Sequence, residues 1–439
     1  MKTDFWIDDI NFSKAGRSAY KLANELWPFN RSLTGNGVRE TLDILKREMP
    51  DLEIFSVPTG YKAYDWVVPK EWMVREAWIK TPDGEKICDF KENNLHLIGY
   101  SQPFKGKVEL SILQNHLFSL PDQIDAIPYV TSYYEEKWGF CIKHKDRLEL
   151  KPGVYQVFID VEHFEGFMNY GELLVKGKSK KEVLLSTYIC HPSMANNELS
   201  GPVVAQEIAK IINNIDRYFT YRFLFIPETI GSIVYISKHL KILQENLIAG
   251  FVLTCLGDEG IYSYIPSRYG DSYSDYIVKK TFQHKKKKFK SYSFLDRGSD
   301  ERQFCAPKVN LPICSVTKSK YGTFSQYHTS KDDLNFISSK GLSESIEIYS
   351  HFLFFIENNY VPEVKVLCEP QLGKRSLYSS NSKSRILSNY RDYCNVFAYS
   401  DGINDIFSLS EQIKISVYDI IALVKDLEKE GLITLRQFS

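Results

Sequence analysis

The feature of this sequence that most restricts its fold is an alternation of apolar runs and helical segments after residue 170. The apolar runs include VLLSTYIC (183–190), FTYRFLFIP (219–227) and LIAGFVLTCL (247–256), and each precedes a segment with helical periodicity. Strands that alternate with helices predict a mostly parallel sheet that is covered by helices on both faces. Both faces of such strands are buried, which explains why the runs lack a polar/apolar alternation.

Segments near the start of the chain complete this α/β domain. Residues 13–26 and 36–48 have the periodicity of amphipathic helices, and residues 52–57 have the composition of a short strand. We therefore expect a discontinuous α/β domain that comprises residues 1–60 and 166–370.

The remaining segments predict two smaller domains. Residues 61–165 are rich in tryptophan, tyrosine and turn residues and predict an inserted β-rich domain. The Ser/Asn/Lys-rich stretch GKRSLYSSNSKS (373–384) is typical of a linker. Residues 380–439 then predict a winged-helix-like domain, in which Ser416 caps a helix that ends at Gly431.

Composition excludes several classes of function. The 439 residues include 43% hydrophobic and 25% charged residues, and Lys+Arg and Asp+Glu are equal at 55 each. A balanced charge gives no field that would attract nucleic acid or anionic lipid. No apolar run approaches the roughly 18–20 residues that span a bilayer, so we expect a cytoplasmic protein without membrane contact. The eight cysteines include no Cys-x-x-Cys pair and read as reduced, buried residues.

Candidate metal ligands follow the predicted strands. His191 follows the first apolar run, Glu228 the second and Asp258 the third, while His328 follows the later run PICSVTKS. Open α/β sheets place their chemistry at the carboxyl ends of their strands, so these side chains are expected to converge. Imidazole and carboxylate are the ligands that zinc prefers, and catalytic zinc leaves one position open. Glu228 or Glu198 would supply the base that moves a proton from water to a leaving amine.

Structural explanations compete with these assignments. A lone histidine such as His191 is usually a hydrogen-bonded structural residue, and only its combination with His328 and Glu228 favours a site. Asp258 lies in Gly-Asp-Glu-Gly, which is also an ordinary turn. We predict that Asn197, Asp300 and Tyr327 contact the substrate, although an N-cap role explains Asp300 equally well.

Several motifs together carry a resemblance to a known superfamily. HPSMANNELSG, PETIGS, CLGDEG, GSDERQF and YHTS occur in this order and resemble the landmarks of the zinc-dependent aminopeptidases. The whole chain is similar to a bacterial family with an aminopeptidase-like domain, an inserted β domain and a C-terminal winged helix. Its further landmarks are NRSLTGNGVRETL (30–42), VPTGYKAYDWVVPKEW (57–72) and VTSYYEEKWGFC (130–141). Members of this family are often associated with surface-polysaccharide loci.

The resemblance implies a three-layer αβα fold and one or two zinc ions, but the motifs depart from the pattern at two positions. Asn197 stands where the superfamily has an aspartate that bridges two zinc ions. Thr229 follows Glu228 where the superfamily has a second glutamate. An amide binds zinc more weakly than a carboxylate, so we expect one ion rather than two. His191, His328, Glu228 and Asp258 would be its ligands.

The resulting hypothesis is a zinc-dependent hydrolase of the aminopeptidase type. Its substrate would be a small peptide or an amide of an amino-sugar or glycan precursor. One alternative is a catalytically degenerate protein that binds a metal or ligand and is linked to polysaccharide biosynthesis. Another is a winged-helix regulator, but the segment SVYDIIALVKDLEKEG (416–431) has no surplus of basic residues, so nucleic acid is not an expected partner. Self-association into a homo-oligomer is left open.

Overall fold

The computed structural model describes residues 5–133, 135–375, 377 and 386–438, and the chain divides into two compact units. The larger unit comprises Asn11–Asp275 and Lys288–Ile348, and the smaller comprises Met1–Ile10, Tyr276–Lys287 and Tyr349–Ser439. Much of the predicted linker lies outside the described residues. Among the described residues, no helix is both long and apolar enough to cross a membrane.

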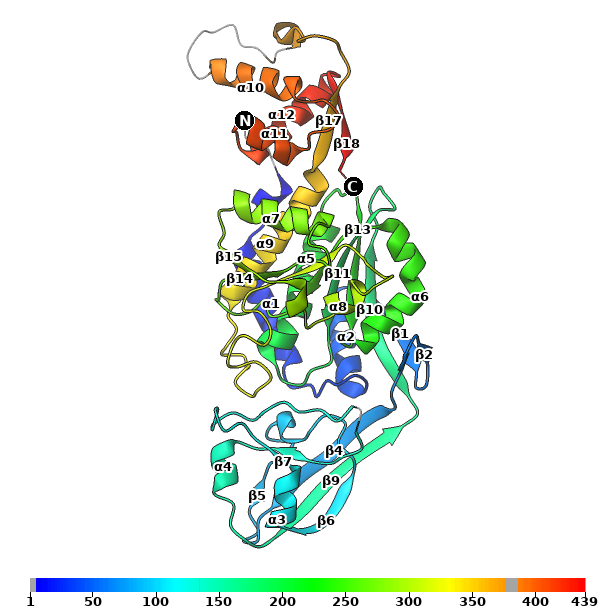
Figure 1. Ribbon diagram of the computed structural model, residues 1–439, viewed down its shortest axis with the longest axis vertical. Coiled ribbons are helices and arrows are strands. Elements are labelled where there is room, and N and C mark those ends of the chain that lie inside the picture. Colours follow the sequence, from blue (N-terminus) through cyan, green and yellow to red (C-terminus); the bar gives the residue numbers. More distant parts are fainter. Residues whose placement is uncertain (1–4, 134, 376, 378–385, 439) are drawn as a thin grey trace. The chain divides into compact units, whose positions relative to one another are not determined.

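An eight-stranded sheet forms the centre of the larger unit (Figure 1). Strands β12, β11, β13 and β16 run parallel, whereas β1 and β10 add an antiparallel edge. At the other edge, β14 is antiparallel to β16 and parallel to β15. The sheet is therefore mixed but mostly parallel at its centre, as predicted. In spatial order, the strands are β1 (Glu53–Pro58), β10 (Phe167–Val175), β12 (Thr220–Ile226), β11 (Glu182–Tyr188), β13 (Leu247–Leu253), β16 (Ile313–Thr317), β14 (Tyr262–Ile265) and β15 (Phe289–Ser291).

Helices cover both faces of this sheet. Figure 1 shows α1 and α5 on one side and α6 on the other. Every residue of β11, β12 and β13 is buried, which is the expected result for strands that have a covering layer on each face. The helices that lie wholly within the larger unit are α1 (Phe12–Leu26), α2 (Asn36–Glu48), α5 (Ser200–Asn213), α6 (Ile230–Asn246) and α8 (Glu301–Phe304). Helices α7 (Tyr273–His284) and α9 (Ser339–Asn358) are divided between the two units.

A second, four-stranded sheet accounts for much of the region predicted as a β-rich insert. Its antiparallel strands lie in the order β5 (Lys86–Ile87), β4 (Glu71–Lys80), β9 (Val154–Phe164) and β6 (Phe104–Glu109). Trp72, Phe140 and Tyr155 are buried in its core, so aromatic residues of the insert serve packing. The same region contains β2 (Lys62–Ala63), β3 (Trp66–Val67), β7 (Leu117–Phe118), β8 (Phe140–Cys141), α3 (Leu110–Leu113) and α4 (His144–Leu148).

The smaller unit contains an antiparallel strand pair and three helices at its C-terminal end. These are β17 (Tyr360–Val364), β18 (Ile433–Gln437), α10 (Ile386–Ala398), α11 (Ile406–Ile413) and α12 (Val417–Lys429). The side chain of Ser416 caps α12 and accepts a hydrogen bond from the Tyr418 amide, as its position predicts. The Tyr418 ring packs against the rings of Phe354 and Phe355 in α9, so α12 is fixed within its own unit.

Candidate functional site

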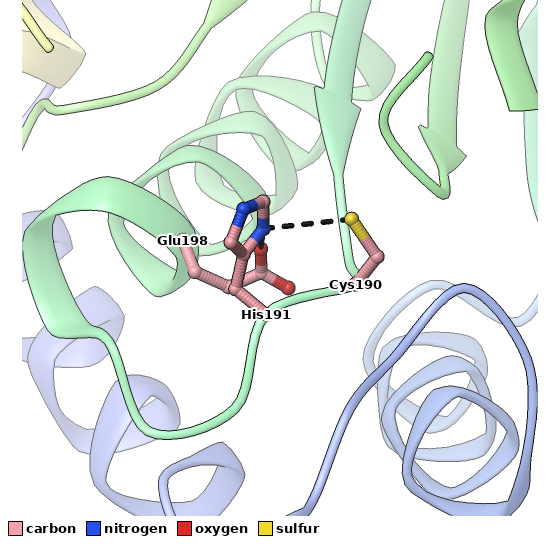
Figure 2. Close-up of side chains that lie close together, drawn as sticks. All are labelled: Cys190, His191 and Glu198. Carbon is pink, nitrogen blue, oxygen red and sulfur yellow. Dashed lines mark hydrogen bonds and ion pairs between the residues drawn. The ribbon is translucent and has the colours of Figure 1, made fainter. Parts of the chain in front are cut away.

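His191 is held beside a carboxylate by the turn that precedes α5. Between β11 and α5, the chain forms a π-helical turn, Ala195–Leu199. Glu198 lies in this turn, and its Oε2 is 2.9 Å from His191 Nδ1 (Figure 2). The start of α5, which follows this turn, approaches the strands closely at Gly201, where a Cβ atom would lie 2.2 Å from a threonine hydroxyl of β11. Glycine is therefore required for this arrangement.

Arg31 reaches the same pair of residues from the loop between α1 and α2. Its Nε donates to the His191 carbonyl oxygen at 3.0 Å and lies 3.3 Å from Glu198 Oε1. Its Nη1 donates to the Leu26 carbonyl oxygen at 2.6 Å. The side chains of Arg31 and Glu198 are both fully buried, so their opposite charges face each other without solvent screening.

This arrangement orients the imidazole of His191. Burial raises the pKa of Glu198 to about 8, and the Arg31 guanidinium opposes that rise by favouring the carboxylate. When Glu198 is ionised, it accepts the Nδ1 proton of His191 and leaves the Nε2 lone pair free, and its pKa of about 8 means that this form predominates only above that pH. Burial, with a smaller effect of Arg31, lowers the pKa of His191 to about 3. The ring is therefore neutral at pH 7, as zinc binding requires.

Glu228 faces the free nitrogen of His191. It follows β12, and its Oε2 lies 3.8 Å from His191 Nε2. Its backbone N–H donates to Cys190 Sγ at 3.1 Å. The next residue, Thr229, has φ 67° and ψ −72°, a strained conformation for a β-branched residue that is characteristic of functional sites. Burial, and then the nearby Asp300, raise the pKa of Glu228 to about 8, and the Arg302 guanidinium opposes this rise.

His328 completes the cluster from the loop after β16. Its ring centroid lies 5.5 Å from that of His191, and the Tyr327 ring stacks on it at 3.9 Å. Its carbonyl oxygen accepts a hydrogen bond from the Tyr129 amide at 2.8 Å, so the insert supports this loop. Burial and then the neighbouring His191 lower the pKa of His328 to about 3, which keeps this ring neutral as well.

The side chains of His191, Glu228 and His328 line one cavity of about 470 Å³. This volume lies within the range of about 300–1,000 Å³ that is typical of small-molecule sites. The insert supplies one wall and the strand ends supply the other. The cavity is lined by Leu33, Asp65, Trp66, Val67, Pro69, Tyr129, Thr131, Tyr133, Cys190, His191, Glu228, Thr229, Ile230, Arg302 and His328.

Parts of this geometry fit a shared zinc ion, although among the described residues the ligand atoms of His191, Glu228 and His328 do not all lie within 4.8 Å of one another, so ion binding would have to draw them together. Two imidazoles that bind one tetrahedral ion at about 2.0–2.1 Å place their ring centroids about 5 Å apart. The observed separation of 5.5 Å between His191 and His328 agrees with this value. The 3.8 Å between His191 Nε2 and Glu228 Oε2 also leaves room for an ion between the two atoms. The donor set of two imidazoles and one carboxylate is one that zinc prefers.

A second group of potential ligands lies on the opposite side of the His191 ring. Ligand atoms of Cys190, His191 and Glu198 lie within 4.8 Å of one another (Figure 2). On this side, however, Glu198 already faces the guanidinium of Arg31. A cation placed there would be repelled by that charge, so the Nε2 side is the better position for a metal.

The structure does not bring Asp258 into the cluster. Its carboxylate accepts hydrogen bonds from Asn196 Nδ2 at 2.8 Å and from the Ser319 amide at 3.1 Å, and it does not line the cavity. The side chain of Asn197 is also hydrogen-bonded within the protein, because its Oδ1 accepts a hydrogen bond from the Tyr188 hydroxyl at 3.0 Å. The backbone N–H of Asn197 donates to Asp332, a buried carboxylate that the sequence motifs did not single out.

The other two predicted substrate contacts lie behind the cavity wall. Asp300 is fully buried and accepts hydrogen bonds from the Thr229 amide and the Ser232 hydroxyl, both at 2.8 Å. It therefore supports the strained turn after Glu228 rather than capping α8 with its side chain. Tyr327 contacts the site through its stacking on His328.

Sequence reasoning missed Tyr129. Its ring lies 5.3 Å from that of His191 and 5.2 Å from that of His328. Because it belongs to the insert, no strand-end pattern could have indicated it. The motif VTSYYEEKWGFC, which begins at the next residue, was the nearest available signal.

Comparisons with solved structures define the class of fold. The zinc aminopeptidase BSAP from Bacillus subtilis aligns with a TM-score of 0.59 and 13% identity, over 77% of this chain and 94% of that one. A "Peptidase M28 precursor" from Shewanella amazonensis aligns with a TM-score of 0.56 and 14% identity, over 82% and 97% of the two chains. The larger unit therefore has the aminopeptidase-like α/β fold.

The chain belongs to the family described as "Domain of unknown function (DUF4910)", whose model matches residues 20–359. A winged helix-turn-helix model matches residues 360–435. A Clostridium acetobutylicum protein, the "Putative polysaccharide biosynthesis protein with aminopeptidase-like domain", is 44% identical over 370 residues, which are 84% of each chain. A crystal structure titled "putative peptidase" from the same organism aligns with a TM-score of 0.91 and 40% identity over 98% of both chains.

Proposed function

We propose that this chain is a zinc-dependent hydrolase of the aminopeptidase type that holds one zinc ion at the cavity. The supporting observation is that the His191 and His328 rings lie 5.5 Å apart in a cavity that also contains the Glu228 carboxylate. These residues would supply the three protein ligands that catalytic zinc sites commonly have. Zinc bound there would act as a Lewis acid on a carbonyl group and lower the pKa of water.

In this proposal, the two candidate glutamates have different tasks. Glu228 lines the cavity, and its carboxylate form can accept a proton from water and return it to a departing amine. Its second oxygen remains available for the metal. Glu198 instead fixes the orientation of His191, because its two oxygens face His191 and Arg31.

The proposed substrate is a small peptide or an amide of an amino-sugar or glycan precursor. Trp66, Tyr129 and Tyr133 line the cavity, and aromatic rings of this kind pack against sugar rings or apolar side chains. The name of the Clostridium relative, which refers to polysaccharide biosynthesis, supports the second kind of substrate.

Metal analysis combined with an activity screen tests this proposal. We expect the purified full-length protein to retain about one zinc ion per chain. We also expect it to hydrolyse aminoacyl anilides or N-acyl amino sugars only when zinc is present. Removal of zinc by a chelator should abolish turnover, and added zinc should restore it. A protein that binds no zinc under these conditions would contradict the proposal.

A second candidate function is a metal- or ligand-binding protein without turnover. It is favoured by the position of Asn197, whose side-chain oxygen is bonded to the Tyr188 hydroxyl. Bound zinc with no hydrolysis across a broad amide panel would support this candidate against the enzyme.

We further propose that α12 packs within its own unit and does not read DNA. The exposed side chains of α12 are Asp419, Lys425, Glu428 and Lys429, which give no net positive charge toward phosphate. We expect the full-length protein to leave duplex DNA unshifted in a mobility assay at about 50 mM salt. Retardation that weakens as salt increases would contradict this expectation.

A further inference from the structure

We propose that Arg302 recognises an anionic group, a carboxylate or a phosphate, on the molecule that enters the cavity. Arg302 lines the same cavity as His191, Glu228 and His328. This inference rests on the proposed function only in that the proposed function specifies which bond of the bound molecule would react. The anion preference itself is a property of the cavity and can be measured without turnover.

In the part of the chain that the structure describes, the guanidinium of Arg302 makes no close ion pair, and it interacts with the carboxyl groups of Glu228 and Asp300 only at longer range. Its Nη2 donates to Thr229 Oγ1, which is a neutral acceptor. Its Nε is buried, and none of the described residues accepts a hydrogen bond from it. Nε is therefore closed to a ligand in the cavity, whereas Nη1 is not among the buried atoms and donates to no residue that the structure describes, so Nη1 can meet a ligand acceptor.

The charges of the cavity lining restrict a bound anion to the position of Arg302, because the other charged residues of the lining are acidic. The remaining charged residues in its lining are Asp65, which is exposed, and Glu228. Arg302 is the only lysine or arginine among the residues that line the cavity. Guanidinium binds carboxylate and phosphate through paired, charge-assisted hydrogen bonds, which fix the orientation of the ligand.

The aromatic and apolar lining of the cavity adds a second requirement for the ligand, besides its anionic group. Trp66, Tyr129 and Tyr133 provide aromatic surface, and Leu33 and Ile230 add apolar surface. A molecule that satisfies both requirements has a ring or apolar body and one anionic substituent. The class of ligand is therefore an anionic sugar or a small peptide with a free carboxylate.

Calorimetric titration with matched probes tests this inference. Glucose, glucuronate and glucose 6-phosphate share one ring and differ in the group at a single carbon, and Ala-Phe differs from Ala-Phe amide in its carboxylate alone. We expect the full-length protein to bind the anionic member of at least one set about 10- to 100-fold more tightly than the neutral member. Preference for glucuronate and Ala-Phe assigns a carboxylate, and preference for glucose 6-phosphate alone assigns a phosphate.

Three variants separate charge recognition from structural effects. Arg302→Gln should remove the preference, whereas Arg302→Lys should keep part of it because the positive charge remains. Arg297→Gln is the matched control, because Arg297 is exposed and lies outside the cavity lining. Equal affinity for charged and neutral probes, or a preference that survives Arg302→Gln, overturns the inference.

The titrations are repeated after zinc has been removed with a chelator. A preference that remains in the zinc-free protein and depends on Arg302 supports the inference even if no hydrolysis is detected. A preference that disappears with zinc assigns the anion to the metal and overturns the role of Arg302. Failure of the proposed hydrolase and failure of this inference are therefore distinguishable.

Discussion

Replacement of His191 with alanine should lower the affinity for zinc by more than about 100-fold and abolish zinc-dependent turnover. Loss of a residue that only orients a metal ligand commonly costs about 10–100-fold in affinity, and loss of the ligand itself costs more. His191 is the residue most constrained in the cluster, because Glu198 fixes its Nδ1 and Arg31 binds its carbonyl oxygen. Equilibrium competition against a chromogenic zinc chelator measures the change.

Two further variants complete this experiment. Glu228→Gln should also weaken zinc binding and eliminate turnover, since we assign it as both ligand and proton acceptor. A Glu228→Gln protein that keeps wild-type zinc affinity but loses turnover would restrict Glu228 to the role of base. His144→Ala is the matched control, because His144 lies in the insert outside the cavity lining. Wild-type zinc affinity in His191→Ala would contradict the proposed site.

Replacement of Arg31 with methionine should lower the free energy of unfolding by about 3–5 kcal/mol. The reason is that Glu198 would remain fully buried without its partner, and its pKa, about 8 beside Arg31, would rise further, so that it must take up a proton. The variant also loses hydrogen bonds to the carbonyl oxygens of His191 and Leu26. Denaturant unfolding of the full-length protein, monitored by fluorescence, measures the effect.

Double substitution identifies the cause of this loss. Adding Glu198→Gln to Arg31→Met removes the buried carboxyl group that has lost its partner, so part of the lost stability should return. Arg47→Met is the matched control, because Arg47 pairs with Glu25 at the surface, where both side chains are more than 40% exposed. An exposed pair of this kind contributes at most about 1 kcal/mol. An Arg31→Met protein that is no less stable than Arg47→Met would argue against a role for the buried pair.

Much of the candidate site was predictable from local sequence patterns. The apolar runs identified β11 and β12, and the positions after them correctly placed His191 and Glu228 at one edge of the sheet. The periodicity of residues 36–48 matched α2 in full. Such predictions succeed because strand burial and helix amphipathicity depend on residues that are close in sequence.

Asp258 illustrates where this reasoning reaches its limit. The same strand-end argument that identified His191 also predicted Asp258 as a ligand, yet its carboxylate bonds to Asn196 and Ser319. The chain after β13 passes through Cys255 at φ 52°, a left-handed conformation that redirects the residues that follow. The motif located Asp258 near the sheet edge, but the loop conformation decided where its side chain points.

The sequence by itself determined the layered α/β architecture, the winged-helix segment and the presence of histidines and a glutamate at strand ends. Only the tertiary structure decided that Arg31 neutralises Glu198 from 160 residues before His191, that Tyr129 of the insert packs against both imidazoles, and that Arg302 faces the cavity. Periodicity reports which face of an element is buried. The partner of a buried charge depends on contacts between distant segments, and these form only when the chain packs.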